Sequence, residues 1–372
     1  MISMKVMVLG VILMLLTDGA FALKNVKVFK AAGKKVQVEE VARGLQIPWG
    51  FDFLSPHEMI VTERQGTIKR IKVASGQKTA VGGVPKVTAS GQGGLLDIGL
   101  HPHFKKNRLL YLTYAAPFGA GHTTKLAMAK LGAKKLEQLK VLFVAKPAAS
   151  GFLHYGARIA FDGQGHLFVS LGERGDRDRA QNLRAHGGKV IRLNLDGSIP
   201  QDNPFANQKN ALPEIWTYGH RNPQGLVYHG ATGTLWEQEH GPKGGDEINV
   251  IKKGRNYGWP IITYGREYWG PKIGTTHKKG LAQPIHHFTP SIAPSGLTIY
   301  TGSRFPRWRG DLFSGALKLT HINHLKMGKG RKVVKEYRYL EDWGRRIRNI
   351  KAGPDGYLYF STDHGEIMRL TP

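Results

Sequence analysis

Three observations predict that the chain folds as an all-β protein, a six-bladed β-propeller. Short runs of β-forming residues recur between Gly, Asp, Pro and Asn turns, and helical periodicity is scarce. Glycine makes up 48 of the 372 residues, which suits a fold with many tight turns. Six segments follow one order, an apolar strand, a turn, a second strand and a glycine or charged end. Such recurrence, at roughly 40–60 residues, is typical of propeller blades.

The six segments span residues 49–71, 95–114, 157–175, 225–242, 296–325 and 347–370. The stretch KVQVEEVARGL, 35–45, alternates like a strand and is expected to complete the last blade and close the ring. One blade cannot bury both of its faces alone, so residues 23–372 are expected to form a single domain. A large sandwich of unrelated hairpins is the alternative.

Residues 1–22 have the features of a secretory signal peptide. Lys5 precedes an apolar run, 6–16, and Ala20-Phe21-Ala22 fits a small-x-small cleavage site. The alternative is an uncleaved membrane anchor, for which the apolar run is short. No later segment has the length and hydropathy of a span. The mature protein is therefore expected to be periplasmic or secreted, in a bacterium.

Composition excludes some functions and favours others. The chain has no cysteine, which excludes thiolate zinc sites, iron–sulfur clusters and cysteine nucleophiles. Its net charge of +27 favours anionic partners, among them an anionic envelope surface. The lysines are scattered and no nucleic-acid-binding motif accompanies them, so no specific nucleic-acid binding is expected. A solvated basic surface is the alternative interpretation.

Two neighbouring stretches contain candidates for acid–base chemistry. In LHYGARIAF, His154 precedes a predicted strand, where it is either a general base or an ordinary turn histidine. In SLGERGDRDRAQN, 170–182, Glu173 and two aspartates alternate with arginines. This alternation indicates either a self-neutralising salt network or a carboxylate that orients the histidine.

Other stretches favour the binding of a ligand or a cation. EQEHGPKGGDEINVI, 237–251, is rich in oxygen donors and is either a calcium site or an acidic turn. Arg346 and Arg348 stand at strand spacing and so share one side, where they either bind a carboxylate or phosphate ligand or form a basic strand face. Lys318 lies in an otherwise apolar predicted strand, at its end or in a site. WTYGHRNPQGL, 216–226, is either a tight structural turn or the wall of a site.

Taken together, these stretches resemble the soluble pyrroloquinoline quinone (PQQ)-dependent sugar dehydrogenases, the glucose/sorbosone dehydrogenase family, and most closely its aldose sugar dehydrogenase branch. The resemblance extends from about residue 40 to the C-terminus. Its most specific pieces are GQGGLLDIGLHPHF, HYGARIAFDGQGHLFVSLGERGD, GKVIRLNLDGSIPQDNPF, YGHRNPQGL, EHGPKGGDEINVI, GRNYGWP, PSIAPSGL and RIRNIKAGPDG. It implies a six-bladed propeller with PQQ and calcium at the mouth of its channel.

The resemblance also implies how the reaction is catalysed. His154 corresponds to the general base that removes the proton from the anomeric hydroxyl of an aldose, whose C1 hydride passes to carbon 5 of PQQ. Arg221 and Asn222 correspond to the pair beside the reactive quinone oxygen, where negative charge develops. The backbone carbonyls of Gly241 and Pro242 correspond to calcium ligands, and the ion acts on the quinone as a Lewis acid.

The remaining correspondences concern the cofactor's carboxylates and the substrate. Three cations correspond to those that hold the carboxylates of PQQ: Lys318, Arg346 and Arg348. Asp363 corresponds to an acidic position near the two arginines, and Gln92 and Gln181 to polar groups on the substrate side. The implied cofactors are PQQ and Ca2+. The electron acceptor is not indicated, and the protein is expected to be a monomer or a homodimer.

The sequence departs from the family pattern at two places. Glu173 stands where relatives have Asp, so a contact with His154 would have to be rearranged. Phe288-Thr289 stands where glucose-type relatives carry a tryptophan over the cofactor, so either Phe288 supplies the platform or the mouth is more open. Either alternative at Phe288-Thr289 favours a broad aldose range over specificity for glucose. Two other function classes fit a propeller: a calcium-dependent lactonase or related hydrolase, and a non-catalytic propeller that binds glycans or an anionic envelope surface.

Overall fold

The computed structural model describes residues 23–31 and 33–372, so the predicted signal peptide, 1–22, lies outside the described residues. Regular structure is almost entirely β. The described part contains 25 strands, five short 3-10 helices and one α-helix of four residues, Phe104–Asn107 (α1). None of the described helices is long and apolar enough to cross a membrane.

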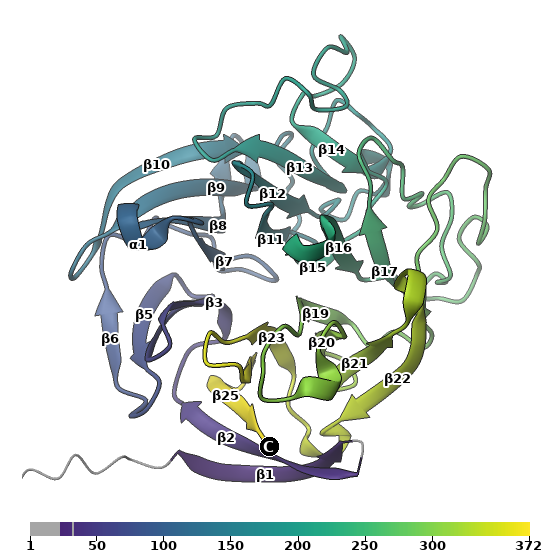
Figure 1. Cartoon of the computed structure of the whole chain (residues 1–372). Helices are drawn as coiled ribbons and strands as arrows, with labels where there is room; N and C mark the ends of the chain where they lie inside the picture. The colour runs from purple at the N-terminus through teal and green to yellow at the C-terminus, as the bar shows by residue number, and fades with distance from the viewer. Residues whose placement is uncertain (1–22, 32) are drawn as a thin grey trace, which may run out of the picture.

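The strands form six antiparallel sheets arranged around a central axis (Figure 1). Blade 1 consists of β3 (Pro48–Ser55), β4 (Glu58–Glu63), β5 (Thr67–Lys72) and β6 (Lys78–Val81). Blade 2 consists of β7 (Leu95–Leu100), β8 (Leu109–Phe118), β9 (Gly121–Leu131) and β10 (Leu136–Val144). Blade 3 consists of β11 (Gly156–Phe161), β12 (His166–Leu171), β13 (Lys189–Asn194) and β14 (Ile215–Tyr218).

The second half of the chain repeats this arrangement. Blade 4 consists of β15 (Pro223–His229), β16 (Thr234–Glu239), β17 (Asp246–Ile251) and β18 (His286–Phe288). Blade 5 consists of β19 (Pro294–Ile299), β20 (Leu312–Ala316), β21 (Ile322–Met327) and β22 (Val333–Tyr339). Blade 6 consists of β23 (Ile347–Ala352), β24 (Leu358–Thr362) and β25 (Glu366–Thr371), joined by β2 (Lys34–Ala42) and β1 (Lys24–Ala31).

The first strand of each blade is the innermost one. These six strands contact one another in sequence around the ring, and β23 contacts β3 to complete it. Each of the six recurrent sequence segments supplies the inner strands of one blade. The predicted six-bladed propeller is therefore confirmed, and the alternative of a sandwich of hairpins is wrong.

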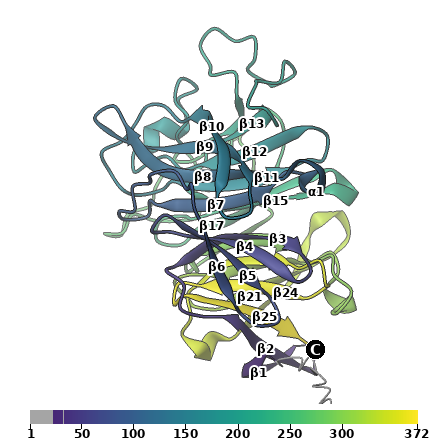
Figure 2. The same ribbon diagram turned by 90° about the vertical axis from the view of Figure 1, so that its left-hand side faces the viewer.

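An N-terminal strand closes the ring, as the alternation in 35–45 predicted. β2 pairs antiparallel with β25, with Val38 opposite Leu370. Figure 1 and the side view in Figure 2 both show β1 and β2 beside the C-terminal strand. Blade 6 thus combines strands from both ends of the described chain. Opening the ring at this blade would require the loss of the whole pairing between β2 and β25.

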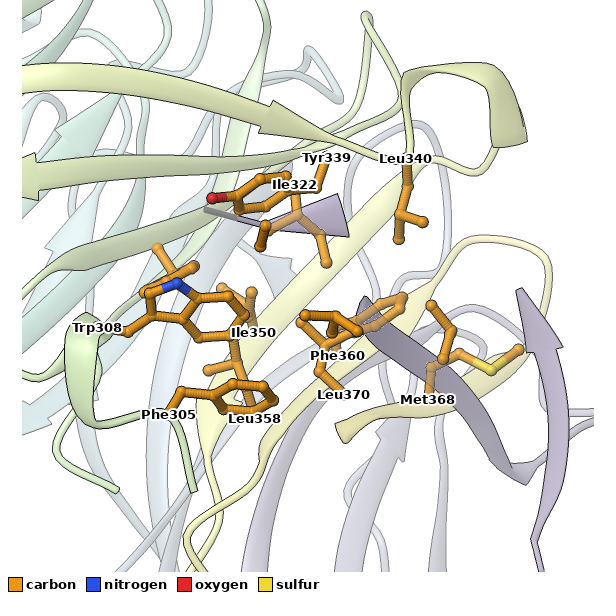
Figure 3. Packing of buried hydrophobic residues seen from close by; sticks show 14 of the residues in the cluster. Phe305, Trp308, Ile322, Tyr339, Leu340, Ile350, Leu358, Phe360, Met368 and Leu370 are labelled. Carbon is orange, nitrogen blue, oxygen red and sulfur yellow. The ribbon is translucent and has the colours of Figure 1, made fainter. Parts of the chain in front are cut away.

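Apolar packing reinforces this closure. Figure 3 shows side chains of blade 5, such as Trp308 and Tyr339, packed against Phe360 and Leu370 of blade 6. Val38 of β2 belongs to the same buried cluster. Full burial of one such side chain stabilises a fold by about 1.5–3 kcal/mol. The closure of the ring within blade 6, and the interface of this blade with blade 5, are therefore held by packing as well as by backbone hydrogen bonds.

The central channel is blocked by Arg158 of β11. Its Nε donates to the carbonyl of Gln224 at 2.8 Å, and its Nη2 donates to the carbonyl of Arg348 at 3.1 Å. Its Nη1 lies 3.3 Å from Oδ1 of Asp97, and the guanidinium lies over the ring of Trp49 at 3.9 Å. A cavity of about 200 Å³ lies beyond it, toward the end where the innermost strands finish.

The opposite end of the channel, where the innermost strands begin, is called the mouth below. Because neighbouring strands are antiparallel, the second strand of each blade ends where its first strand begins. The mouth is therefore built from two kinds of segment: the residues that precede each innermost strand, and the turns between each second and third strand.

Candidate active site

Segments from five blades bring the residues singled out in the sequence to the mouth. Those that precede or begin an innermost strand are Gln92 in blade 2, His154 in blade 3, Arg221 and Asn222 in blade 4, and Arg346 and Arg348 in blade 6. Those in turns between second and third strands are Glu173 in blade 3, Gly241 and Pro242 in blade 4, Lys318 in blade 5 and Asp363 in blade 6. The propeller thus gathers residues that are far apart in the sequence.

Glu173 makes a direct contact with His154. Its Oε2 lies 2.6 Å from Nδ1 of His154, and the side chains are 4% and 12% exposed. The same oxygen accepts from the backbone N–H of Gly175 at 2.9 Å. The longer side chain of glutamate therefore reaches the imidazole within a buried pair. It fixes the orientation of the ring and leaves Nε2 as the nitrogen available to take a proton.

The backbone of His154 is held in an unusual conformation. Its φ of +49° lies in the left-handed region, which costs free energy for a residue with a side chain. Its N–H donates to Oε1 of Gln92 at 2.9 Å. A Cβ on Gly172 would lie 2.2 Å from its carbonyl oxygen, so only glycine fits there. The surrounding segments over-determine the position of His154, as expected of a functional residue.

Arg174 holds the same loop from the other side, a role that the sequence did not reveal. Its Nη2 donates to the carbonyl of Gly151 at 2.6 Å, and Nη1 donates to the carbonyl of Leu153. Its guanidinium stacks over the ring of Tyr155 at 3.4 Å. The other arginines of this stretch make ion pairs instead: Arg179 with Asp176, and Arg177 with Glu267. The predicted salt network is therefore present only in part.

Arg221 and Asn222 are buried between β14 and β15. Nη1 of Arg221 donates to the carbonyls of His240 at 3.2 Å and Gly241 at 3.0 Å. Oδ1 of Asn222 accepts from the N–H of Gly156 at 3.2 Å, which ties this segment to the one that carries His154. The stretch 216–226 is thus a wall of the site, between the histidine and the expected calcium ligands.

The other polar groups of this stretch are structural. His220 is fully buried, contacts Oγ1 of Thr217 at 3.0 Å and Oε1 of Glu239 at 3.1 Å, and stacks on Tyr257. Gly219 has a φ of +80°, and a Cβ there would collide with Asn256. The segment is therefore pinned along its length, which aims the side chains that follow it.

The two glutamines assigned to the substrate side differ in their surroundings. Gln92 is exposed and uses its amide oxygen to hold the backbone of His154. Gln181 has its amide nitrogen bonded to the carbonyl of Trp259 at 2.6 Å and exchanges two bonds with the amide of Asn256. In this structure Gln181 therefore positions the segment that carries Trp259, whereas Gln92 lies beside His154 at the mouth.

Three buried glutamates lie next to Gly241 and Pro242. Nδ2 of Asn249 lies 3.1 Å from Glu237, 3.5 Å from Glu239 and 3.3 Å from Glu247. Burial, and then the neighbouring Glu239 carboxylate, raise the pKa of both Glu237 and Glu247 well above its usual range. So much buried negative charge favours a compensating cation.

The donor set fits calcium. A cavity of about 10 Å³, room for one water or small ion, is lined by Gly241, Glu239 and Glu247 among others. Ligand atoms of His220, Glu237 and Glu239 lie within 4.8 Å of one another. Calcium prefers carboxylate and carbonyl oxygens, and Gly241 keeps a second lone pair beside its bond to Arg221. The alternation of glutamates in EQE, which puts Glu237 and Glu239 on one side of a strand, is the signal that could have revealed the cluster.

Arg346 and Arg348 converge on Asp363, as the resemblance implied. Nε of Arg346 lies 2.9 Å from Oδ2, and Arg348 makes two bonds of 2.7 Å, one to each carboxylate oxygen. Burial favours the neutral acid, but the Arg348 and Arg346 guanidiniums outweigh it and lower the pKa of Asp363. Arg346 also donates to the carbonyl of Leu317, next to Lys318. Arg346, Arg348 and Asp363, with Lys318 in the adjoining turn, form a cation-rich wall that fits a ligand with several carboxylates.

Two sequence expectations need correction. Lys318 does not lie in a strand: β20 ends at Ala316, and Lys318 is exposed in the following turn. Phe288 does not supply a platform at the mouth, because it is buried in an apolar cluster with Trp236 and Ile292. Thr289, which follows it, is exposed. The alternative in which Phe288 supplies the platform is therefore wrong.

His240 is a further residue at the mouth that sequence reasoning missed. Nε2 lies 2.6 Å from the carbonyl of Pro294, so this nitrogen carries the proton. Burial lowers the pKa of His240 to about 3, and the Arg221 guanidinium adds to the effect. The imidazole is therefore neutral at working pH, with Nδ1 as an acceptor. No spacing in the sequence distinguished it from the other 15 histidines.

Comparisons with known proteins identify the family and agree with the fold. Residues 45–369 match the model of a family described as Glucose / Sorbosone dehydrogenase. The chain is 41% identical over 351 residues to aldose sugar dehydrogenase YliI of Escherichia coli, covering 92% of this chain and 94% of that protein. The apo-form structure of the soluble aldose sugar dehydrogenase of Escherichia coli superimposes with a TM-score of 0.88, at 40% identity, over 91% and 99% of the two chains. A PQQ-bound aldose sugar dehydrogenase of Streptomyces coelicolor superimposes with a TM-score of 0.76, at 28% identity, over 90% and 98%.

Proposed function

The chain belongs to the glucose/sorbosone dehydrogenase family, and from that premise we propose that it is a PQQ- and calcium-dependent dehydrogenase that oxidises aldose sugars at C1 to the lactone. The observation that carries the proposal is the buried contact between His154 and Glu173 at the mouth of the propeller. An imidazole oriented by a carboxylate is the arrangement expected of a general base. The aldose sugar dehydrogenases of similar sequence and structure support the substrate class.

In this proposal His154 takes the proton from the anomeric hydroxyl through Nε2. Glu173 holds the ring in place and stabilises the positive charge that the imidazole gains. When bound, PQQ supplies the two-electron acceptor to which the C1 hydride passes as the lactone forms. Glu173 is itself held by Gly175 and by the carbonyl of Arg221, so the base does not have to reorganise during the reaction.

Arg221 and Asn222 would act where negative charge develops on the reacting quinone oxygen. Both are buried, so their hydrogen bonds would form in a region of low dielectric, where such bonds are strongest. Gly241 and Pro242 would hold calcium through their backbone carbonyls. The ion would act there as a Lewis acid, and the buried glutamates behind it would balance its charge.

The wall of Lys318, Arg346 and Arg348 would hold the carboxylates of PQQ. This wall is the feature that a calcium-dependent lactonase would not need, because a lactone carries no such anionic group. The exposed Thr289 and the absence of an aromatic platform from Phe288 support an open mouth and a broad aldose range.

Reconstitution of the purified apo-protein tests the proposal. PQQ and calcium are added, and reduction of an artificial dye is followed with a panel of aldoses, with PQQ or calcium left out as controls. Dye reduction that needs the sugar, PQQ and calcium together is the expected result. Hydrolysis of a lactone without PQQ would favour the lactonase, and binding of a glycan without either reaction would favour a non-catalytic propeller.

The family of the chain and the signal-peptide features of residues 1–22 also support a proposal about the location of the protein. We propose that the signal segment is removed after Ala22 and that the mature chain, 23–372, is one exported domain. N-terminal sequencing of the protein purified from a bacterial periplasmic fraction checks this, and Leu23 is the expected first residue. An intact N-terminus in the membrane fraction would instead indicate an anchor.

A further inference from the structure

Arg64 lies at the mouth, and neither the sequence motifs nor the family resemblance assigned a function to it. It lies in the turn between β4 and β5, the second and third strands of blade 1. In blades 5 and 6 the same turn carries Lys318 and Asp363. Arg64 is therefore their topological counterpart in the blade that follows blade 6 around the ring.

The side chain of Arg64 reaches toward the cation-rich wall. Its pKa is lowered first by burial and then by the charge of Arg348, and Asp363 opposes this. The Arg64 guanidinium is therefore close enough to both groups to feel their charges. Gly94 makes room for it, because a Cβ there would lie 2.7 Å from Cγ of Arg64.

The guanidinium is incompletely satisfied within the protein. Nη1 donates to the carbonyl of Gly91, but Nε is buried and has no hydrogen-bond partner. Among residues 23–31 and 33–372, no carboxylate lies within ion-pair distance of Arg64. A buried, unpaired donor on an arginine is costly unless a ligand satisfies it.

Charge balance points in the same direction. Lys318, Arg346 and Arg348 provide three positive charges, and Asp363 neutralises one of them. Two net charges remain on this wall, and the proposed function adds calcium and Arg221 at the quinone. Arg64 contributes one more positive charge beside the wall, where a polyanionic cofactor would lie.

We propose that Arg64 is a further cofactor-binding residue, which donates to a carboxylate of PQQ and adds to the positive charge of its site. The inference rests on the proposed function. Arg64 also helps to position the loop beside His154, on the substrate side of the site. Arg64 holds the carbonyl of Gly91, and the next residue, Gln92, accepts from the backbone N–H of His154. Binding of PQQ would therefore order the loop that supports the base.

Equilibrium binding of PQQ tests this without any measurement of turnover. Apo-protein with calcium is titrated with PQQ, and quenching of tryptophan fluorescence is recorded for the wild type, Arg64→Gln and Arg64→Lys. We expect Arg64→Gln to weaken PQQ affinity by about 10- to 100-fold, the size of one charge-assisted hydrogen bond. Arg64→Lys keeps the positive charge but not the planar guanidinium with its several donors, so it should lose less PQQ affinity. Arg309→Gln, an exposed arginine on the β19–β20 connection at the other end of the propeller, is the matched control.

The trimethyl ester of PQQ separates charge recognition from a purely structural role. With the ester, wild type and Arg64→Gln should bind alike, because the carboxylate charges are gone. An equal loss for both ligands would show that Arg64 only supports the loop 88–94 and would overturn the inference. Unchanged PQQ affinity in a folded Arg64→Gln, with a thermal melt like the wild type, would overturn it too. Failure of the wild type to bind PQQ at all would instead refute the proposed function.

Discussion

Nδ1 of His154 lies 2.6 Å from Oε2 of Glu173, and both side chains are almost fully buried. An aspartate at this position would be one methylene shorter. The glutamate reaches the ring because it is pinned at both ends: its N–H donates to the carbonyl of Arg221, and its carboxylate accepts from Gly175. Glu173 orients the imidazole of His154 through its contact with Nδ1. The left-handed backbone of His154 fixes the direction in which the side chain leaves the loop.

His154→Ala should abolish the chemical step and leave the cofactor site intact. Loss of a general base typically costs about 10²–10⁴-fold in rate. Single-turnover dye reduction with PQQ, calcium and saturating glucose measures that step. PQQ affinity, from fluorescence quenching, should stay within about twofold of the wild type, since His154 is not in the cation-rich wall. A variant that loses PQQ binding together with its activity would indicate a cofactor-binding role instead.

Glu173→Gln should lower kcat and change KM little. The amide keeps the size of the side chain and can still accept from Gly175, but it cannot stabilise the charge that His154 gains. For histidines that bind a metal, removal of the group that orients the ring typically costs about 10- to 100-fold, and we expect a loss of similar size here. Steady-state kinetics with Glu173→Asp as the second variant checks the geometry. A lower activity in Glu173→Asp than in Glu173→Gln would show that reach matters more than charge.

Arg346→Gln combined with Arg348→Gln should weaken PQQ binding and not the chemistry of bound PQQ. The double variant leaves Asp363 buried without its cations, so Asp363→Asn is added to avoid an unpaired charge. We expect the triple variant to bind PQQ at least about 100-fold more weakly, as loss of two charge-assisted contacts predicts. Turnover at saturating PQQ should fall much less. Titration of dye reduction with PQQ measures both quantities.

The blades were predictable because their inner strands carry a local signal. Segments such as 157–175 place two apolar strands around a tight turn. Each of these strands is apolar because it is buried in the sheet, and this makes it recognisable in the sequence. The outer strands β6, β14 and β18 have three or four residues, lie at the edge of their sheets and follow no such rule. The closing strand β2 was recognisable because it alternates.

The site was predictable only where a family motif or a strand period marks a residue. Arg346 and Arg348 stand at strand spacing, and the structure brings both to Asp363. Arg64 and His240 carry no such mark, because their importance depends on which turns the ring brings together. The burial of a single residue also cannot be predicted from its type alone. Phe288 was a candidate platform for the cofactor but is buried in the core. Lys318 was expected in a strand but lies in an exposed turn.

Thr289→Trp should narrow the range of sugars. Thr289 is exposed next to the turn that carries Gly241 and Pro242, because a Cβ on Gly244 would lie 3.3 Å from its Cγ2. A tryptophan there would cover part of the mouth. We expect kcat/KM for a disaccharide such as maltose to fall by about tenfold relative to glucose, which corresponds to about 1.4 kcal/mol. Thr289→Val is the control of similar size to threonine, and equal effects on both sugars would contradict the open-mouth interpretation.

Glu237→Gln should stabilise the apo-protein at alkaline pH. Burial, followed by the Glu239 and Glu247 carboxylates, raises the pKa of Glu237 well above the 4.5 expected in an unfolded chain. Below pH 4.5 the carboxyl is protonated in both states, and its contribution to stability is fully present. As the pH rises toward the raised pKa, the unfolded chain releases the proton in water while the folded chain must keep it or bury a charge. Stability is therefore lost as pH rises through that window.

Thermal melts in EDTA between pH 5 and pH 8 measure this effect, with the exposed Glu341→Gln as control. The melting temperature of Glu237→Gln should exceed that of the wild type at pH 8, by about 1–2 °C for each kcal/mol in a chain of this length, and the difference should shrink toward pH 5. Calcium should shrink it as well, because a cation beside Glu239 and Glu247 compensates the charge that the glutamine removes. A difference that is constant with pH would mean that Glu237 is ionised in the folded protein at every pH tested, which would contradict the raised pKa.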